Sequence, residues 1–144
     1  SVNGGGAANG KGWSMIFNHV ANRVAAPHFD TVVALFVERL GFVVLRRNER
    51  AIWMRQPGAN IDLQFSCVAA SRDDDERERS QVSFLSETPQ ADLETLAVWL
   101  RARGLAARVG AYSEREFYLD VPDALVDFVI EAMRPELADY PVKV

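Results

Sequence analysis

The chain has 144 residues, a formal net charge of −4 and a single cysteine, and its composition is that of an ordinary globular protein. This length is enough for one domain with a substantial core. The acidic balance argues against a general nucleic-acid-binding protein, because phosphate neutralisation needs a basic surface. With Cys67 alone, an intrachain disulfide and a zinc site of several thiolates are excluded, and a reducing, cytoplasmic location is the expectation.

We expect a tail at each end of the chain, and the C-terminal one is expected to pack on the fold. Residues 1–14 are rich in glycine and asparagine and lack the apolar core of a signal peptide, so we interpret them as a disordered tail or a cloning remnant. Residues 134–144 contain Pro135 and Pro141 and are expected to form a short tail rather than one long helix. No apolar run approaches the roughly 20 residues that cross a membrane, so no membrane association is expected.

Two stretches of the sequence share one pattern, which is a strand, a proline-containing turn and a second strand. They span residues 51–66 and 116–131, and their aromatic and β-branched residues favour strands. This correspondence predicts an internal repeat. When the stretches are aligned on Pro57 and Pro122, an apolar–acid–apolar triplet falls at the same offset in each: Ile61-Asp62-Leu63 and Val126-Asp127-Phe128.

The elements expected along the chain follow the same order in both halves. The first half predicts a strand over 15–24, a helix from Pro27 to Gly41, a strand over 42–45 and the hairpin over 51–66. The second half predicts a strand over 81–85, a helix from Pro89 to Gly104, a strand over 105–109 and the hairpin over 116–131. Residues 71–80, between the halves, are a run of mixed charge that we interpret as a solvated linker, because it has no apolar partner to bury it.

Two local motifs resemble those of a known superfamily. The end of the first helix is similar to its Phe-Tyr pair, short spacer and Leu-Gly-Phe, with Val37 in place of the tyrosine; it reads Phe36-Val37-Glu38-Arg39-Leu40-Gly41-Phe42. The last hairpin, residues 117–130, resembles the superfamily's final hairpin, whose Asp-Pro-Asp-Gly turn is here Val121-Pro122-Asp123-Ala124. The chain therefore resembles the vicinal oxygen chelate superfamily of glyoxalases, bleomycin resistance proteins and extradiol dioxygenases.

The resemblance implies an α+β fold of two tandem βαβββ modules, residues 15–70 and 81–133, joined by the charged linker. Their strands would form a curved mixed sheet around an open cleft, with the helices outside. In metal-dependent members, four side chains from the first and fourth strands of the two modules line that cleft. Carried onto this sequence, the metal-binding positions are His19, Asp62, Gln81 and Asp127, and Asp127 reaches its position only if the turn holds one extra residue.

Two functions are compatible with this resemblance, and a dimeric scaffold that binds no ligand is a third possibility. A nickel, zinc, iron or manganese ion held by that quartet would polarise a substrate carbonyl, as in a glyoxalase-like lyase, an isomerase or a dioxygenase. Alternatively, a cleft without a complete metal site, and so without a cofactor, would capture a small, partly aromatic molecule in sequestration or resistance. We favour the second, because the quartet has only one imidazole and its aspartates are shorter than the usual glutamates.

The residues expected to contact such a ligand combine aromatic rings with polar groups on the cleft-forming strands. They are Phe17, His19, Trp53, Gln81, Tyr112 and Tyr118. Rings beside a concave sheet can stack on a flat or cationic molecule. The expected assembly is a homodimer, because the strand edges and apolar helices of two modules often pair with a second copy.

Overall fold

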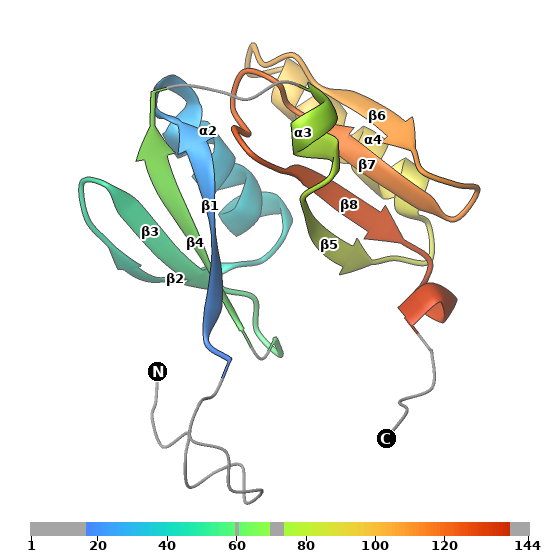
Figure 1. Ribbon diagram of the computed structural model, residues 1–144, viewed down its shortest axis with the longest axis horizontal. Helices are drawn as coiled ribbons and strands as arrows, with labels where there is room; N and C mark the ends of the chain where they lie inside the picture. Colours follow the sequence, from blue (N-terminus) through green and yellow to red (C-terminus); the bar gives the residue numbers. More distant parts are fainter. Residues whose placement is uncertain (1–16, 60, 70–73, 139–144) are drawn as a thin grey trace, which may run out of the picture.

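The computed structural model describes residues 17–59, 61–69 and 74–138, which form two modules of the same topology (Figure 1). The first four-stranded sheet has the order β1-β4-β3-β2 and the second has the order β5-β8-β7-β6. In each sheet the outer first strand pairs in parallel with the fourth, and the other pairs are antiparallel. The predicted α+β fold of two βαβββ modules is thereby confirmed. The strands are β1 (His19–Ala25), β2 (Val43–Arg47), β3 (Ala51–Arg55), β4 (Asp62–Val68), β5 (Gln81–Leu85), β6 (Arg108–Ala111), β7 (Glu116–Asp120) and β8 (Val129–Met133).

A helical segment connects the first two strands of each module. In the first module η1 (Ala26–His28), α2 (Phe29–Ala34) and the π-helical η2 (Leu35–Arg39) follow one another, and in the second the connection is α4 (Pro89–Arg101). Both segments begin beside a proline, whose missing N–H costs nothing in the first turn of a helix. Both end at a glycine with positive φ, 74° at Gly41 and 84° at Gly104, which favours glycine over residues with a side chain. The two predicted helices are thus confirmed.

One aromatic core joins the two modules. The ring of Phe36 in η2 lies 4.9 Å from that of Phe65 in β4 and 6.4 Å from that of Phe84 in β5. Phe65 also stacks on Phe128, with 5.6 Å between the ring centroids. Since Phe36, Phe65 and Phe128 have no exposed surface, these contacts bury large apolar areas that neither module could bury alone.

The modules also meet through their backbones at one end of β1. Val24 forms an isolated antiparallel bridge with Leu125, and the N–H of Ala25 donates to the carbonyl of Ala124 at 2.8 Å. The N–H of Val126 donates to the carbonyl of Arg23 at 3.0 Å. The segment 121–128, which connects β7 and β8, therefore reaches across to the first module. The turn predicted at Pro122 and Asp123 is present, with the N–H of Ala124 donating to the carbonyl of Val121 at 3.0 Å, but the strand expected directly after it is not, since β8 begins only at Val129.

The charged segment between the modules differs from the solvated linker that we predicted. Its described part contains a short helix, α3 (Asp74–Glu78), which Figure 1 shows in front of the second sheet, on the side away from α4. Arg77 of α3 is only 2% exposed and is bound to Asp120 in β7. The expectation failed for Arg77 because a charged side chain can be buried when an opposite charge and its hydrogen bonds are already in place.

Some expectations concern residues outside the described ranges. These are the tail over 1–14, the first two residues of the strand predicted from Met15, residues 71–73 of the linker, and the last part of the C-terminal tail from residue 139. The described part of that tail contains η3 (Pro135–Ala138). Within the described residues, no helix has the length and apolar character needed to span a bilayer.

Candidate ligand-binding site

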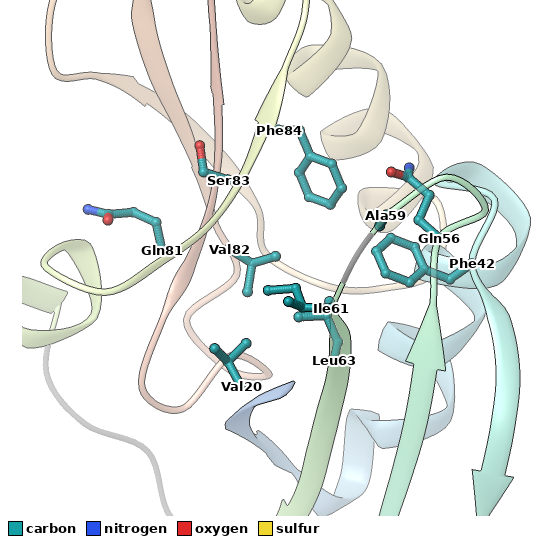
Figure 2. Close-up of a pocket in the computed structure, with 10 residues that line it drawn as sticks. All are labelled: Val20, Phe42, Gln56, Ala59, Ile61, Leu63, Gln81, Val82, Ser83 and Phe84. Atoms are coloured by element: carbon teal, nitrogen blue, oxygen red, sulfur yellow. The ribbon is translucent and has the colours of Figure 1, made fainter. Parts of the chain in front are cut away.

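A pocket of about 270 Å³ lies between the two modules, and its lining includes residues of β1 and β5 (Figure 2). Both are terminal strands of their sheets, so each turns an unpaired edge outward. The boundary between the two modules is called the seam below. Backbone contacts of Arg23 and Val24 close it at one end of β1, whereas Val20, near the other end of β1, lines the pocket. Its lining comes from both modules: Val20, Phe42, Gln56, Ala59, Ile61, Leu63, Gln81, Val82, Ser83 and Phe84.

The pocket is mostly apolar, with polar groups at defined places. The rings of Phe42 and Phe84 meet edge to face with 6.1 Å between their centroids, one from each module. The carboxamide of Gln56 is oriented by a 2.9 Å hydrogen bond from its Nε2 to the carbonyl of Leu40. Its Oε1 has no hydrogen-bond partner among the described residues and can accept a bond from a ligand. An apolar cavity with a few oriented polar groups is the usual form of a small-molecule site.

A second pocket of about 230 Å³ adjoins the first and shares Gln56 and Phe84 with it. It lies beneath the start of α4, and its charged lining residues are Arg39 at the end of η2 and Asp92 in the first turn of α4. The remaining lining residues are Leu40, Leu85, Ser86, Leu93, Leu96, Ile130 and Ala132.

Of the four predicted metal-binding positions, His19 and Asp62 are brought together. They are register partners on the parallel pair β1 and β4, so their side chains share one face of the sheet. The carboxylate of Asp62 is already bound by the guanidinium of Arg55, at 2.5 Å from Nε and 3.2 Å from Nη2. The ring nitrogen Nδ1 of His19 lies 2.7 Å from Oδ1 of Asn18. The aspartate of this pair is therefore neutralised by an arginine.

Asp127 lies elsewhere. It precedes β8, and its carboxylate accepts bonds from the backbone N–H of Arg23 at 2.9 Å and from Nε of Arg23 at 3.0 Å. Arg23 is four residues further along β1 than His19, which corresponds to roughly 13 Å along a strand. The bidentate partner and this separation place Asp127 at the closed end of the seam, far from His19.

The strand registers explain why the sequence alignment of the repeat misplaced Asp127. His19, the first residue of β1, pairs with Asp62, whereas Gln81, the first residue of β5, pairs with Val129. Val129 is thus the structural counterpart of Asp62, and the aligned Asp127 is two residues too early. Within residues 17–59, 61–69 and 74–138 no three His, Cys, Asp or Glu side chains are grouped so that they could hold a metal ion. The donor groups present do not fit a divalent ion bound by the predicted quartet.

The six predicted ligand-contact residues fall into two separate groups. Gln81, Tyr112 and Tyr118 lie together beside α3, where Gln81 Nε2 donates to the hydroxyl of Tyr112 at 3.2 Å. That hydroxyl donates to the carbonyl of Glu78 at 2.6 Å, and the two tyrosine rings are 4.8 Å apart. Burial raises the pKa of Tyr112 above its usual value, although the bond from Gln81 acts in the opposite direction.

The other three predicted residues belong to the first module. Phe17 precedes β1 and is 65% exposed, and His19 is also exposed. The indole Nε1 of Trp53 in β3 donates to Oε1 of Gln64 at 3.0 Å, and the guanidinium of Arg46 lies over the indole at 5.0 Å. Of the six, Gln81 alone also lines the pocket between the modules.

Helix α3 covers the face of the second sheet on which the predicted tyrosines lie. Asp120, which has no exposed surface, accepts bonds from Arg77 at 3.1 and 2.7 Å and from Arg108 at 3.2 Å. Arg108 also donates to Glu78 at 2.8 Å and to the hydroxyl of Tyr118 at 3.1 Å. The hydrogen bond to Glu78 is the largest of the effects that raise the pKa of Arg108. Because α3 and this ion-pair network occupy the face, it is not free in the structure to take a ligand.

The sequence alone did not identify Phe42, Gln56 and Phe84 as pocket residues. Phe42 belongs to the Leu-Gly-Phe motif, which we had taken as a mark of the fold only, and Gln56 adjoins the turn at Pro57. Phe84 is the alternating apolar residue of β5, and its position at a free sheet edge depends on strand order. The sequence signal available was that Phe42 and Gln56 lie at the ends of expected elements, whereas the tertiary arrangement decides that all three residues line a pocket between the modules.

Similarity to solved structures supports the fold, whereas comparisons of the sequence found no match. No family model and no curated protein matches the chain. Lactoylglutathione lyase from Agrobacterium tumefaciens has a similar structure, with a TM-score of 0.52 and 13% identity over 90% of this chain and 100% of that one. A possible glyoxalase from Bacillus cereus has a TM-score of 0.51 and 18% identity over 83% and 99%, and the oxidase ChaP-H2 has a TM-score of 0.50 and 17% identity over 85% and 94%. The protein therefore has the fold of the vicinal oxygen chelate superfamily, as its helix-end and hairpin motifs predicted.

Proposed function

We propose that the protein binds a small, partly aromatic molecule in the pocket between its modules. The observation that carries this proposal is the apolar pocket at the open end of the seam, which is lined by the aromatic rings of Phe42 and Phe84. A dry apolar cavity of about 150 Å³ is enough to hold benzene. A pocket of about 270 Å³ therefore suits a fused bicyclic ring, with Gln56 Oε1 as the acceptor that orients it.

The fold itself does not choose between binding and catalysis. The similar structures are named as a lyase, a possible glyoxalase and an oxidase, and one fold supports many unrelated activities. Binding is favoured over metal-dependent chemistry because both candidate aspartates, Asp62 and Asp127, form a salt bridge with an arginine. We therefore expect purification without chelator to yield no stoichiometric divalent ion, measured by elemental analysis.

A substitution at the rim of the pocket tests the proposal. Ala59 is exposed and lines the pocket, so Ala59→Trp places an indole in the space that a ligand would occupy without altering the core. We expect indole and related bicyclic compounds to raise the melting temperature of the unchanged protein and to leave that of Ala59→Trp unaffected. Ala106→Trp, at an exposed position after α4, is the matched control and should respond as the unchanged protein does.

Binding that persists in Ala59→Trp would place the site elsewhere. If calorimetric titration of the unchanged protein gave no heat with any planar aromatic compound, the proposal itself would fail. The melting curves also report whether each variant is folded, so a loss of binding can be told apart from a loss of structure.

We also propose that the protein forms the homodimer that its sequence led us to expect. The edge strand β2 presents Val43, Val44 and Leu45 with 52%, 43% and 46% of their surface exposed. An exposed apolar edge strand is a common point of contact between copies of a chain. Light scattering on the eluting protein should give twice the mass of the chain; a monomer at all concentrations would contradict this part.

A further inference from the structure

The second pocket carries an inference about the chemical class of the ligand, and it rests on the proposed function. We propose that the ligand is a zwitterionic α-amino acid with an aromatic side chain. Its ring would lie in the first pocket, and its ammonium and carboxylate would lie in the second, between Asp92 and Arg39.

The first step of the argument is that the two pockets are neighbours, which are together called the groove below. Both are lined by Gln56 and Phe84, so a molecule that packs on Phe84 in the first pocket is next to the second. The first pocket has no charged lining residue, whereas the second has Arg39 and Asp92. A ligand that uses both therefore has an apolar part and a charged part.

The second step concerns Arg39, which offers an unused positive charge. It is the last residue of η2 and lines the second pocket. Among the described residues its guanidinium has neither an ion-pair nor a hydrogen-bond partner. A free guanidinium at the edge of an apolar groove is suited to bind a carboxylate through two parallel hydrogen bonds.

The third step concerns Asp92, which offers a fixed negative charge in the same pocket. Its Oδ2 accepts a bond from the hydroxyl of Ser86 at 2.5 Å and its Oδ1 accepts one from Thr88 at 3.2 Å. These hydroxyls orient the carboxylate but leave its charge in place, since no cation of the described chain pairs with it. A carboxylate held in this way can bind an ammonium group.

The two charges do not pair with each other, although they line one pocket. A ligand with a single negative charge would be attracted by Arg39 and repelled by Asp92, and a single positive charge would meet the reverse. A group that carries both charges as substituents of one carbon atom satisfies both residues at once. The α-ammonium carboxylate of an amino acid has this arrangement, and an aromatic side chain then reaches towards Phe84 and Phe42.

The test uses four probes that share an indole ring: L-tryptophan with both charged groups, tryptamine with the ammonium alone, indole-3-propionate with the carboxylate alone, and indole with neither and no side chain. Calorimetric titration of the full chain should give the tightest binding for tryptophan. Removal of either charged group should weaken binding about tenfold, because a hydrogen bond between charged groups contributes about that factor. Indole should bind more weakly still, through the first pocket alone.

Substitutions then connect each charge to its residue. In Arg39→Gln, tryptophan should lose its advantage over tryptamine, which has no carboxylate. In Asp92→Asn, it should lose its advantage over indole-3-propionate, which has no ammonium group. Arg50→Gln and Asp123→Asn are the charge-matched controls, since both residues are exposed and neither lines the groove.

The outcomes separate this inference from the proposed function. If all four probes bind equally, or if Arg39→Gln weakens them all to the same extent, the pocket binds aromatic molecules but the zwitterion assignment is wrong. If none of the four binds, indole included, the proposed function fails and the assignment fails with it. Because the comparison of probes needs only the unchanged protein, a variant that does not fold leaves the test intact.

Discussion

At the scale of single residues, the most consequential side chain outside the pocket is Asp120. It has no exposed surface, and it holds two guanidinium groups, those of Arg77 and Arg108. A buried ion pair is costly to desolvate, so its net contribution to stability can be small, but the loss of one partner leaves an uncompensated charge. Asp120 therefore matters chiefly because it allows Arg77, and with it α3, to rest on the second sheet.

Removal of this carboxylate gives the first prediction. Asp120→Ala should lower the free energy of unfolding by about 3 kcal/mol, because Arg77 is 2% exposed and loses its buried counter-ion. Asp30→Ala, which removes the exposed partner of Arg47, should cost less than about 1 kcal/mol. Urea unfolding measures both values. Equal costs for the two variants would show that the Arg77–Asp120 pair has no special role.

At the scale of elements, β6 and β7 depend on a close approach of a ring to a backbone. Gly110 in β6 is the register partner of Tyr118 in β7, and the ring of Tyr118 lies across the glycine. A Cβ atom at position 110 would lie 2.3 Å from Cζ of Tyr118. The ring cannot easily move away, because its hydroxyl is bound by Arg108 and its centroid lies 4.8 Å from that of Tyr112.

The corresponding prediction is a pair of variants. Gly110→Ala should destabilise the protein by about 1–3 kcal/mol through overpacking, as seen in chemical denaturation. In a Tyr118→Leu background the same change should cost clearly less, because the obstructing ring is gone. Additive costs in the double variant would mean that the strain arises from the strand backbone and not from the ring.

The elements also show what the sequence could predict and what it could not. The helices from Pro27 and Pro89 and the strand over 81–85 were predicted because local residues determine them. The start of β8 was placed too early, since 121–128 takes its conformation from the distant end of β1. For the same reason Asp127 was assigned to a cleft position, and the role of α3 was missed because Arg77 becomes buried only through Asp120, 43 positions further along.

At the scale of the whole molecule, the repeat is visible in the topology, but we expect no sign of it in the unfolding transition. The core that contains Phe36, Phe65, Phe84 and Phe128 runs through both modules, and the loop of the second is bonded to β1 of the first. A chain of this size with one shared core is expected to unfold in a single step. The two modules should therefore not melt independently, although each has its own sheet.

Two tryptophans allow this to be checked. Trp53 lies in β3 of the first module and Trp99 in α4 of the second, while Trp13 precedes the described residues. In a Trp13→Phe background, variants that keep only Trp53 or only Trp99 should give fluorescence transitions with the same midpoint in urea, once corrected for any change in stability. Two midpoints that differ by more than this correction would instead indicate modules that unfold separately.

The position of α3 has a practical consequence for chimeras and recombination between repeats. The segment between the modules is, in energetic terms, part of the second one, because Arg77 and Glu78 are bound to residues of β6 and β7. An exchange of modules with another protein would keep its ion pairs intact only if the crossover fell upstream of Asp74. A crossover placed at Gln81, where the sequence repeat begins, would separate Asp120 from Arg77 and leave a buried carboxylate facing a foreign segment.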